Sequence, residues 1–315
     1  MKTAYRYILA AIFALSAFTG CIRENVDDCE TPVELKFLYF GNGIVDIFHE
    51  RIDSVLMYIY ELPSNSLQKT TRISKDDLLN MQGAKLRLVP GDYRIVCWGN
   101  AGDGSVIDLD AQRLTDREHA ENGTSDGIEE LYFGDVILTV PHTLRPVEET
   151  VIYEASYIMM KVELLGFGNI GNISVDPVEG TSSTIQYADG SNQMVTLAHE
   201  SHSAHIDFDN QPSDDVLTDY IPALSTHPDE EDSYITDYLV PRFDNGTGAD
   251  LSIYRNDTGE LFYSRPMSEL MEELGIVIDD RNEQLVHLKL KTFVSGGEVH
   301  VEVLGWNSEI VFPGL

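Results

Sequence analysis

The sequence predicts an all-β protein made of two tandem β-sandwich domains with a few short helices. Three observations lead to this fold class. Short stretches rich in Val, Ile, Tyr and Phe recur along the chain, many of them alternate apolar with polar residues, and Gly, Pro, Asn and Asp separate them. With 315 residues, the chain is also long enough for two domains of ordinary size.

The first predicted domain covers residues 31–154. Its predicted strands are apolar or alternating stretches bounded by turn residues, namely residues 33–40, 54–60, 85–89, 93–98, 131–135 and 136–140. Pro90-Gly91-Asp92 is predicted to be a turn between two of them, because Pro and Gly supply the dihedral angles that a turn requires. Residues 74–81 predict a short helix capped by Ser74, and the polar residues 115–128 predict a loop.

The second predicted domain covers residues 155–315. The long apolar stretch 151–167 should hold the last strand of one domain and the first strand of the next, so we place the boundary at residues 153–156. Residues 266–274 predict a helix, because their Met and Leu residues follow the i, i+3, i+4, i+7 pattern. A glycine pair at residues 296–297 predicts the closing hairpin.

The N-terminus has the order of a secretory signal. A basic head with Lys2 and Arg6 precedes an apolar core over residues 7–15 and the small residue Gly20 before Cys21. The apolar core is too short to span a bilayer. We therefore predict a signal peptide over residues 1–20 and a covalent lipid on Cys21. The alternative is an ordinary signal peptide followed by an incidental cysteine.

The charge of the chain excludes one class of partner. The net charge of −32 repels phosphate backbones and anionic lipid surfaces, so we expect no nucleic-acid partner and a membrane link made by lipid alone. Residues 21–30 are polar and acidic with few core-forming side chains, which predicts a flexible lipidated tether.

Two cysteines remain if Cys21 carries lipid. Cys29 and Cys97 form an even pair in a compartment that favours disulfides, so they can bridge. The alternative is two free thiols, with Cys97 buried in a strand. The sequence leaves both open, because it does not give the separation of the two Cα atoms.

Motifs for catalysis and cofactor binding are missing from the sequence. It contains no Gly-x-Ser-x-Gly elbow, phosphate-binding loop or dinucleotide fingerprint, so we expect neither an enzyme nor a cofactor. The one histidine cluster, His199, His202 and His205, could bind a transition metal. It could do so if the segment were a loop, whereas on a regular strand His202 would face away from the other two. The sequence shows no second set of ligands, so we expect a solvated loop without a metal site.

Several blocks of the sequence together are similar to those of one protein family. These blocks are Cys21, Asp27-Asp28-Cys29, Leu35-Lys36-Phe37-Leu38-Tyr39, residues 46–60 and, most specifically, residues 88–100. With them the chain resembles the fimbrillin-A-associated anchor proteins of type V fimbriae. The resemblance covers nearly all of the chain after Cys21 and becomes diffuse beyond residue 165.

The resemblance implies a fold, a location and partners. It implies two transthyretin-like β-sandwich domains in an outer-membrane lipoprotein, with palmitate or a similar lipid on Cys21. Such a protein attaches a fimbrial shaft and influences its length, and fimbrial subunits of this type join by strand addition. Polymerising subunits lose an N-terminal strand after Arg or Lys. Here Arg23 lies in the tether and Lys36 inside a predicted strand, so an uncut, lipid-retaining N-terminus suits an anchor.

Two other functions remain open at this stage. One is a tip or accessory fimbrial adhesin of the same fold, because such subunits share the architecture. The other is a surface glycan-binding lipoprotein or a hydrolase on a β-sandwich. The chain has Trp98 and Trp306 as its two tryptophans, and the sequence shows no aromatic platform that would favour this second alternative.

Overall fold

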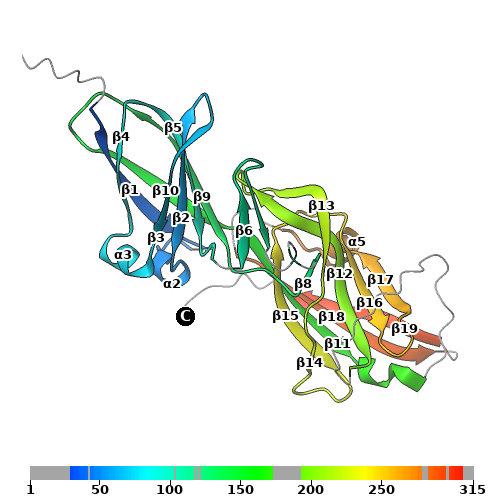
Figure 1. Ribbon diagram of the computed structural model, residues 1–315. Coiled ribbons are helices and arrows are strands. Elements are labelled where there is room, and N and C mark those ends of the chain that lie inside the picture. The colour runs from blue at the N-terminus through cyan, green and yellow to red at the C-terminus, as the bar shows by residue number, and fades with distance from the viewer. Residues whose placement is uncertain are drawn as a thin grey trace, which may run out of the picture.

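The computed structural model describes residues 29–41, 43–102, 104–116, 119, 121, 123–172, 193–278, 283–295 and 298–307. In these residues the chain forms two β-sandwich lobes that lie end to end (Figure 1). The predicted signal peptide, Cys21 and most of the predicted tether lie outside the described residues.

The first lobe is a sandwich of two sheet layers. One layer contains β10 (Val147–Ala155), β1 (Thr31–Tyr39) and β4 (Gly83–Leu88), and the other contains β3 (Ser66–Ile73), β2 (Val55–Leu62), β5 (Gly91–Gly99) and β9 (Tyr132–Val140). The layers join where β9 and β10 pair through Phe133–Glu154 and Tyr132–Ala155. The predicted turn at Pro90 is confirmed as the connection between β4 and β5, but the two strands lie in different layers and do not pair as a hairpin.

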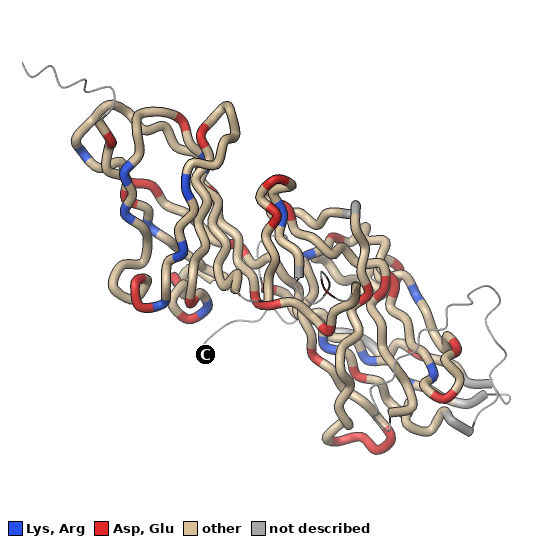
Figure 2. The backbone as a smooth tube through the Cα atoms, viewed as in Figure 1, with Lys and Arg blue, Asp and Glu red and all other residues tan. Residues whose placement is uncertain are grey.

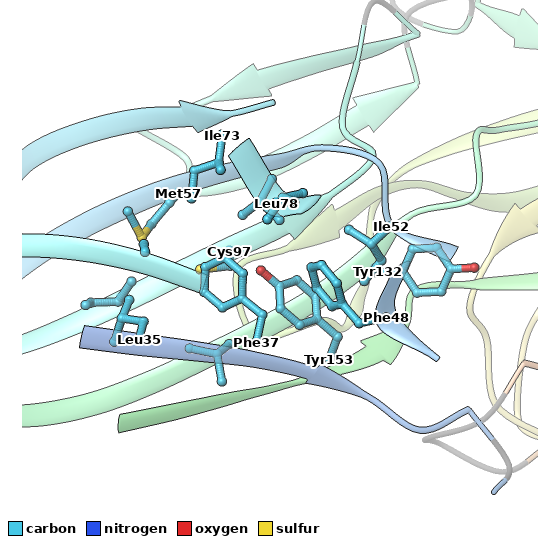
Figure 3. Close-up of a cluster of buried hydrophobic side chains, with 14 of the residues drawn as sticks. Leu35, Phe37, Phe48, Ile52, Met57, Ile73, Leu78, Cys97, Tyr132 and Tyr153 are labelled. Atoms are coloured by element: carbon cyan, nitrogen blue, oxygen red, sulfur yellow. The ribbon is translucent and has the colours of Figure 1, made fainter. Parts of the chain in front are cut away.

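The core of the first lobe lies between its layers and includes side chains from two short helices (Figure 3). Phe37, Phe48 and Tyr153 pack against one another with ring centroids 5.4, 5.6 and 5.8 Å apart. Phe48 comes from α2 (Phe48–Arg51), whereas α3 (Lys75–Asn80) contributes Leu78. The predicted helix is confirmed, and Ser74 caps it through a reciprocal pair of hydrogen bonds with Asp77.

The second lobe is a sandwich of two further sheets. One sheet contains β14 (Ser225–Thr226), β15 (Tyr234–Pro241), β11 (Tyr157–Leu165), β18 (Leu285–Ser295) and β19 (Glu298–Asn307). The other contains β17 (Leu261–Pro266), β16 (Asp250–Arg255), β12 (Val195–Asp207), β13 (Pro212–Tyr220) and β8 (Thr124–Ser125). A 3-10 helix, η2 (Phe167–Asn172), follows β11. The predicted closing hairpin is confirmed as β18–β19.

The apolar helix of the second half also forms as the sequence predicts. It is α5 (Met267–Leu274), which buries Met267, Leu270 and Met271 in the core of the second lobe. Gly275 ends the helix in the left-handed region, with φ at +66°, where a residue without Cβ is least strained.

One segment of the first half belongs to the second lobe, which corrects the predicted loop at residues 115–128. β6 (Ser105–Asp108) pairs with β7 (Arg113–Asp116), and β7 pairs with β12, with Leu114 opposite Ile206. β8 pairs in parallel with β13. These short strands lack a sustained apolar alternation. They are held in place by pairing with longer strands, so the sequence pattern alone does not indicate them.

The two lobes have separate hydrophobic clusters that meet at the predicted boundary. The first cluster ends with Tyr157 and the second begins with Ile158, both in β11. A third cluster joins the lobes, since Tyr58 and Trp98 of the first lobe pack with Phe208, which follows β12. That residues 31–154 and 155–315 fold as separate domains stays a prediction.

Candidate assembly surfaces

The outer end of the first lobe is where the described chain begins. Thr31 starts β1, and its hydroxyl donates to the carbonyls of Pro141 and Thr143 at 2.8 and 3.0 Å. These bonds tie the start of β1 to the loop between β9 and β10. Cys29 is exposed just before this tie. A force applied through the N-terminal segment therefore acts on the chain at this end of the first lobe.

Cys29 and Cys97 are free thiols in the structure, which is the second of the two states that the sequence leaves open. Cys97 lies in the core near the hydroxyl of Tyr153 (Figure 3), and Tyr153 is the register partner of Tyr39 at the end of β1. Cys29 precedes the start of that strand, and nine residues of strand extend over about 26 Å. A disulfide requires Cα atoms within roughly 7 Å. Burial raises the pKa of the Cys97 thiol to about 12.

A buried carboxylate joins the two lobes. Glu283, which precedes β18, accepts hydrogen bonds from the hydroxyls of Tyr39 and Tyr132 at 2.9 and 3.1 Å. The Arg51 guanidinium forms an ion pair with it at 3.3 Å. Burial and the nearby Glu283 charge raise the pKa of Tyr39 far above its usual value. The second lobe thus places a charged side chain inside the first.

A second polar contact between the lobes is centred on Arg94 of β5. Its guanidinium donates to Asp135 of the first lobe at 3.0 Å, and to the Phe208 carbonyl and Asp209 carboxylate of the second lobe, each at 2.6 Å. Burial lowers the pKa of Arg94, but the hydrogen bond and charge of Asp209 outweigh that effect and raise it. We call the Glu283 and Arg94 contacts the seam.

The sheet edges differ in how well they could accept another strand. Among the described residues, the longest edge strand is β19, which has 10 residues and β18 as its neighbour. Val301 and Val303 pack on the second core, whereas Glu302 is exposed. The edge strand β3 is largely exposed and carries Lys69 and Arg72, charges of the kind that discourage strand addition. β19 is therefore the best edge for a partner strand.

Charged side chains do not gather on one surface. Figure 2 shows Asp and Glu spread over both lobes with Lys and Arg between them. A large net charge of this kind keeps a protein soluble and does not by itself define a partner. In the described residues, no helix is long and apolar enough to cross a membrane.

The histidine cluster lies inside β12, which corrects the prediction of a solvated loop. His199, His202 and His205 are each at most 6% exposed. Bulges lie between His199 and His202 and between Ser203 and His205, and Ser201 has a φ of +57°. The bulges break the two-residue alternation, so that all three side chains are buried. Burial lowers the pKa of His202 to about 4.

A cavity of about 270 Å³ lies beside the first bulge. Ser201, His202, Leu217, Phe243 and Asp244 line it, among other residues. Within the described part of the chain, no group of three His, Cys, Asp or Glu side chains is arranged to hold a metal ion.

The comparisons with known proteins identify the family. The sequence model of the fimbrillin-A associated anchor proteins Mfa1 and Mfa2 matches residues 26–312. The chain belongs to this family. It is therefore associated with fimbriae at the cell surface, and the members of its family are structural proteins of fimbriae. None of the curated proteins matches the chain.

Solved structures share the fold of this anchor-family chain. The fimbrial anchor protein Mfa2 from Porphyromonas gingivalis is similar with a TM-score of 0.66 at 13% identity, covering 88% of this chain and 98% of that one. A candidate adhesin from Bacteroides ovatus has a TM-score of 0.64 at 16% identity, covering 91% and 99%. A candidate polysaccharide-binding protein from Bacteroides thetaiotaomicron has a TM-score of 0.62 at 15% identity, covering 91% and 99%. At these identities, the likeness shows the transthyretin-like two-sandwich fold.

The sequence did not indicate the residues of the seam. Glu283 lies in a polar stretch between α5 and β18 and contacts Tyr39 from 244 positions away. Arg94 lies on β5, where the alternation of the strand makes it one more outward polar residue. No local signal could have found either contact of this anchor-family protein, because both depend on how the lobes meet.

Proposed function

We propose that this chain is an outer-membrane lipoprotein that anchors a type V fimbrium and influences its length. The observation that carries the proposal is the match to the anchor-protein family over residues 26–312. The signal-like N-terminus and Cys21 support attachment through lipid. The end-to-end lobes suit a protein that holds something away from the membrane, because their long axis separates the first strand from the second lobe (Figure 1).

The shaft subunit binds by adding a strand to the edge of β19. The length of this edge and its neighbouring apolar face support the assignment, since main-chain pairing gives affinity and side-chain positions give specificity. A photo-crosslinking residue at Glu302 should capture the shaft subunit in cells. The same residue at Lys69 of β3 is the matched control and should capture none. Capture through Lys69 alone would move the docking edge to the first lobe.

Deletion of the gene tests the anchor function. Cells without the protein should shed fimbriae into the medium or assemble fimbriae of altered length, as seen by electron microscopy and by shaft subunit in the culture supernatant. If fimbriae stay attached with normal length while adhesion to a receptor is lost, the chain is a tip or accessory adhesin instead.

The lipid on Cys21 has its own test. Cys21→Ala should release the protein from the membrane fraction, and mass spectrometry of the native protein should find an acylated Cys21 at the mature N-terminus. Cys29→Ala is the control and should remain in the membrane. A native N-terminus elsewhere without lipid would contradict lipid anchoring.

A further inference from the structure

We propose that β1 and β10 form a mechanical clamp, which gives the protein a load-bearing function. The inference rests on the proposed attachment of the chain through its N-terminus. β1 and β10 are parallel neighbours, with register pairs from Val33–Val147 to Tyr39–Tyr153. β1 starts at the outer end of the first lobe, and β10 ends where the second lobe begins (Figure 1).

The direction of load follows from this arrangement. A membrane anchor pulls on the start of β1, away from the second lobe. A fimbrium held by the second lobe pulls on the end of β10 through Ser156. The two parallel strands are then forced to slide past each other, so every hydrogen bond of the ladder is loaded at once. Antiparallel strands pulled at neighbouring ends would instead separate one pair at a time.

Contacts on the other side of β1 strengthen the clamp. β1 is flanked by β4 as well as β10, with antiparallel pairs from Thr31–Leu88 to Lys36–Gly83. Val33 and Phe37 of β1 are completely buried in the core. Extraction of β1 therefore requires two ladders to slide and buried apolar side chains to enter water, which is unfavourable.

The second lobe repeats the arrangement. Its first strand, β11, is parallel to β18, with register pairs from Met159–Leu285 to Leu165–Lys291, and is flanked on its other side by β15. The carboxylate of Glu163 on β11 is hydrogen-bonded to Nε2 of His287 at 2.6 Å and forms an ion pair with Lys289 at 3.0 Å, both on β18. A load that passes the junction and leaves near the end of β18 meets the same sliding geometry.

Single-molecule force spectroscopy on the full-length protein in detergent tests the clamp by changing the direction of pull. Cys29 is an exposed free thiol that can carry one handle, whereas Cys97 is buried. With Ile152→Cys, which is 54% exposed near the end of β10, the second handle makes the strands slide. With Leu144→Cys, which is 83% exposed beside the start of β1, it peels them apart.

The clamp predicts a rupture force several-fold higher for the Ile152→Cys protein than for the Leu144→Cys protein at the same loading rate. Both variants should unfold at the same urea concentration, because both sites are on the surface. Equal forces, or a higher force in the Leu144→Cys protein, would overturn the inference. Neither outcome depends on whether fimbriae are shed when the gene is deleted. The gene deletion therefore tests the anchor function independently of the force measurement.

Discussion

Two buried histidines, His199 and His202, combine full burial with an unsatisfied nitrogen. In each the Nε2 atom is buried without a hydrogen-bond partner. Their ring centroids lie 4.9 Å apart, and Phe243 packs against both. The Nδ1 atom of His202 lies 3.0 Å from the Ser203 carbonyl, so a proton on Nδ1 completes that hydrogen bond and leaves a neutral ring. Burial lowers the pKa of both histidines.

These histidines predict that the protein loses stability as the pH falls below about 6.5. His202 has a folded pKa of about 4 against an ordinary value of 6.5. Between these values the unfolded chain binds a proton that the folded chain does not, so the stability present above pH 6.5 declines by about 1.4 kcal/mol for each pH unit and each histidine. Urea unfolding at pH 7 and pH 5 measures the difference. His202→Phe should reduce this difference, whereas His142→Phe, at an exposed site, should not. A pH dependence left intact by His202→Phe would assign it to other groups.

Single residues were predictable where their role is local. Ser74 was identified as a helix cap because the cap and its partner Asp77 lie three residues apart in the sequence. The free state of Cys97 was not decided by the sequence, because it depends on the distance to Cys29 across the lobe. The partners of Glu283 were likewise hidden, since they come from distant strands of the other lobe.

At the scale of elements, the bulge in β12 depends on the backbone of Ser201. Its φ of +57° lies in the left-handed region, which β-branched residues rarely adopt. Ser201→Val should therefore destabilise the protein by about 1–3 kcal/mol, whereas Ser201→Gly should be neutral or stabilising. Thermal unfolding of both variants measures this. The exposed strand residue Thr70 of β3, changed to Val and Gly, is the control, and there Gly should be the worse of the two. If Ser201→Val and Ser201→Gly have equal stability, the backbone at Ser201 carries no strain.

Elements with a regular pattern were predicted, and elements with a broken pattern were missed. The β4–β5 turn and the β18–β19 hairpin have turn residues between alternating stretches, and α5 has a helical apolar stripe, so local rules suffice. β12 was mistaken for a loop because its bulges disrupt the two-residue period. β7 and β8 were missed because they are short and are held by pairing with β12 and β13 from the other half of the chain.

At the scale of the whole molecule, the seam decides whether the lobes move as one body. The Glu283 contact is buried and ties a charge to Tyr39, Tyr132 and Arg51. The Arg94 contact is more open, because Asp209 is 69% exposed at its side chain. Buried charged pairs cost much more to break than exposed ones, because the remaining partner is left without solvation. The two contacts should therefore contribute unequally to the coupling of the lobes.

Substitution of one residue from each contact tests this inequality. Glu283→Gln keeps the shape of the side chain but removes the charge that faces Arg51, so it should lower the free energy of unfolding by about 2–4 kcal/mol. Arg94→Ala removes a partly exposed ion pair together with its bond to the Phe208 carbonyl, and should cost about 1–2 kcal/mol. Calorimetry measures both.

Because Glu283 joins the lobes, Glu283→Gln should also split a single unfolding transition into two, whereas Lys75→Ala, which removes an exposed ion pair within the first lobe, should leave the transition single. If Glu283→Gln costs less than Arg94→Ala, the open contact is the stronger tie, and the load between the lobes passes mainly through β5 and the turn at Asp209.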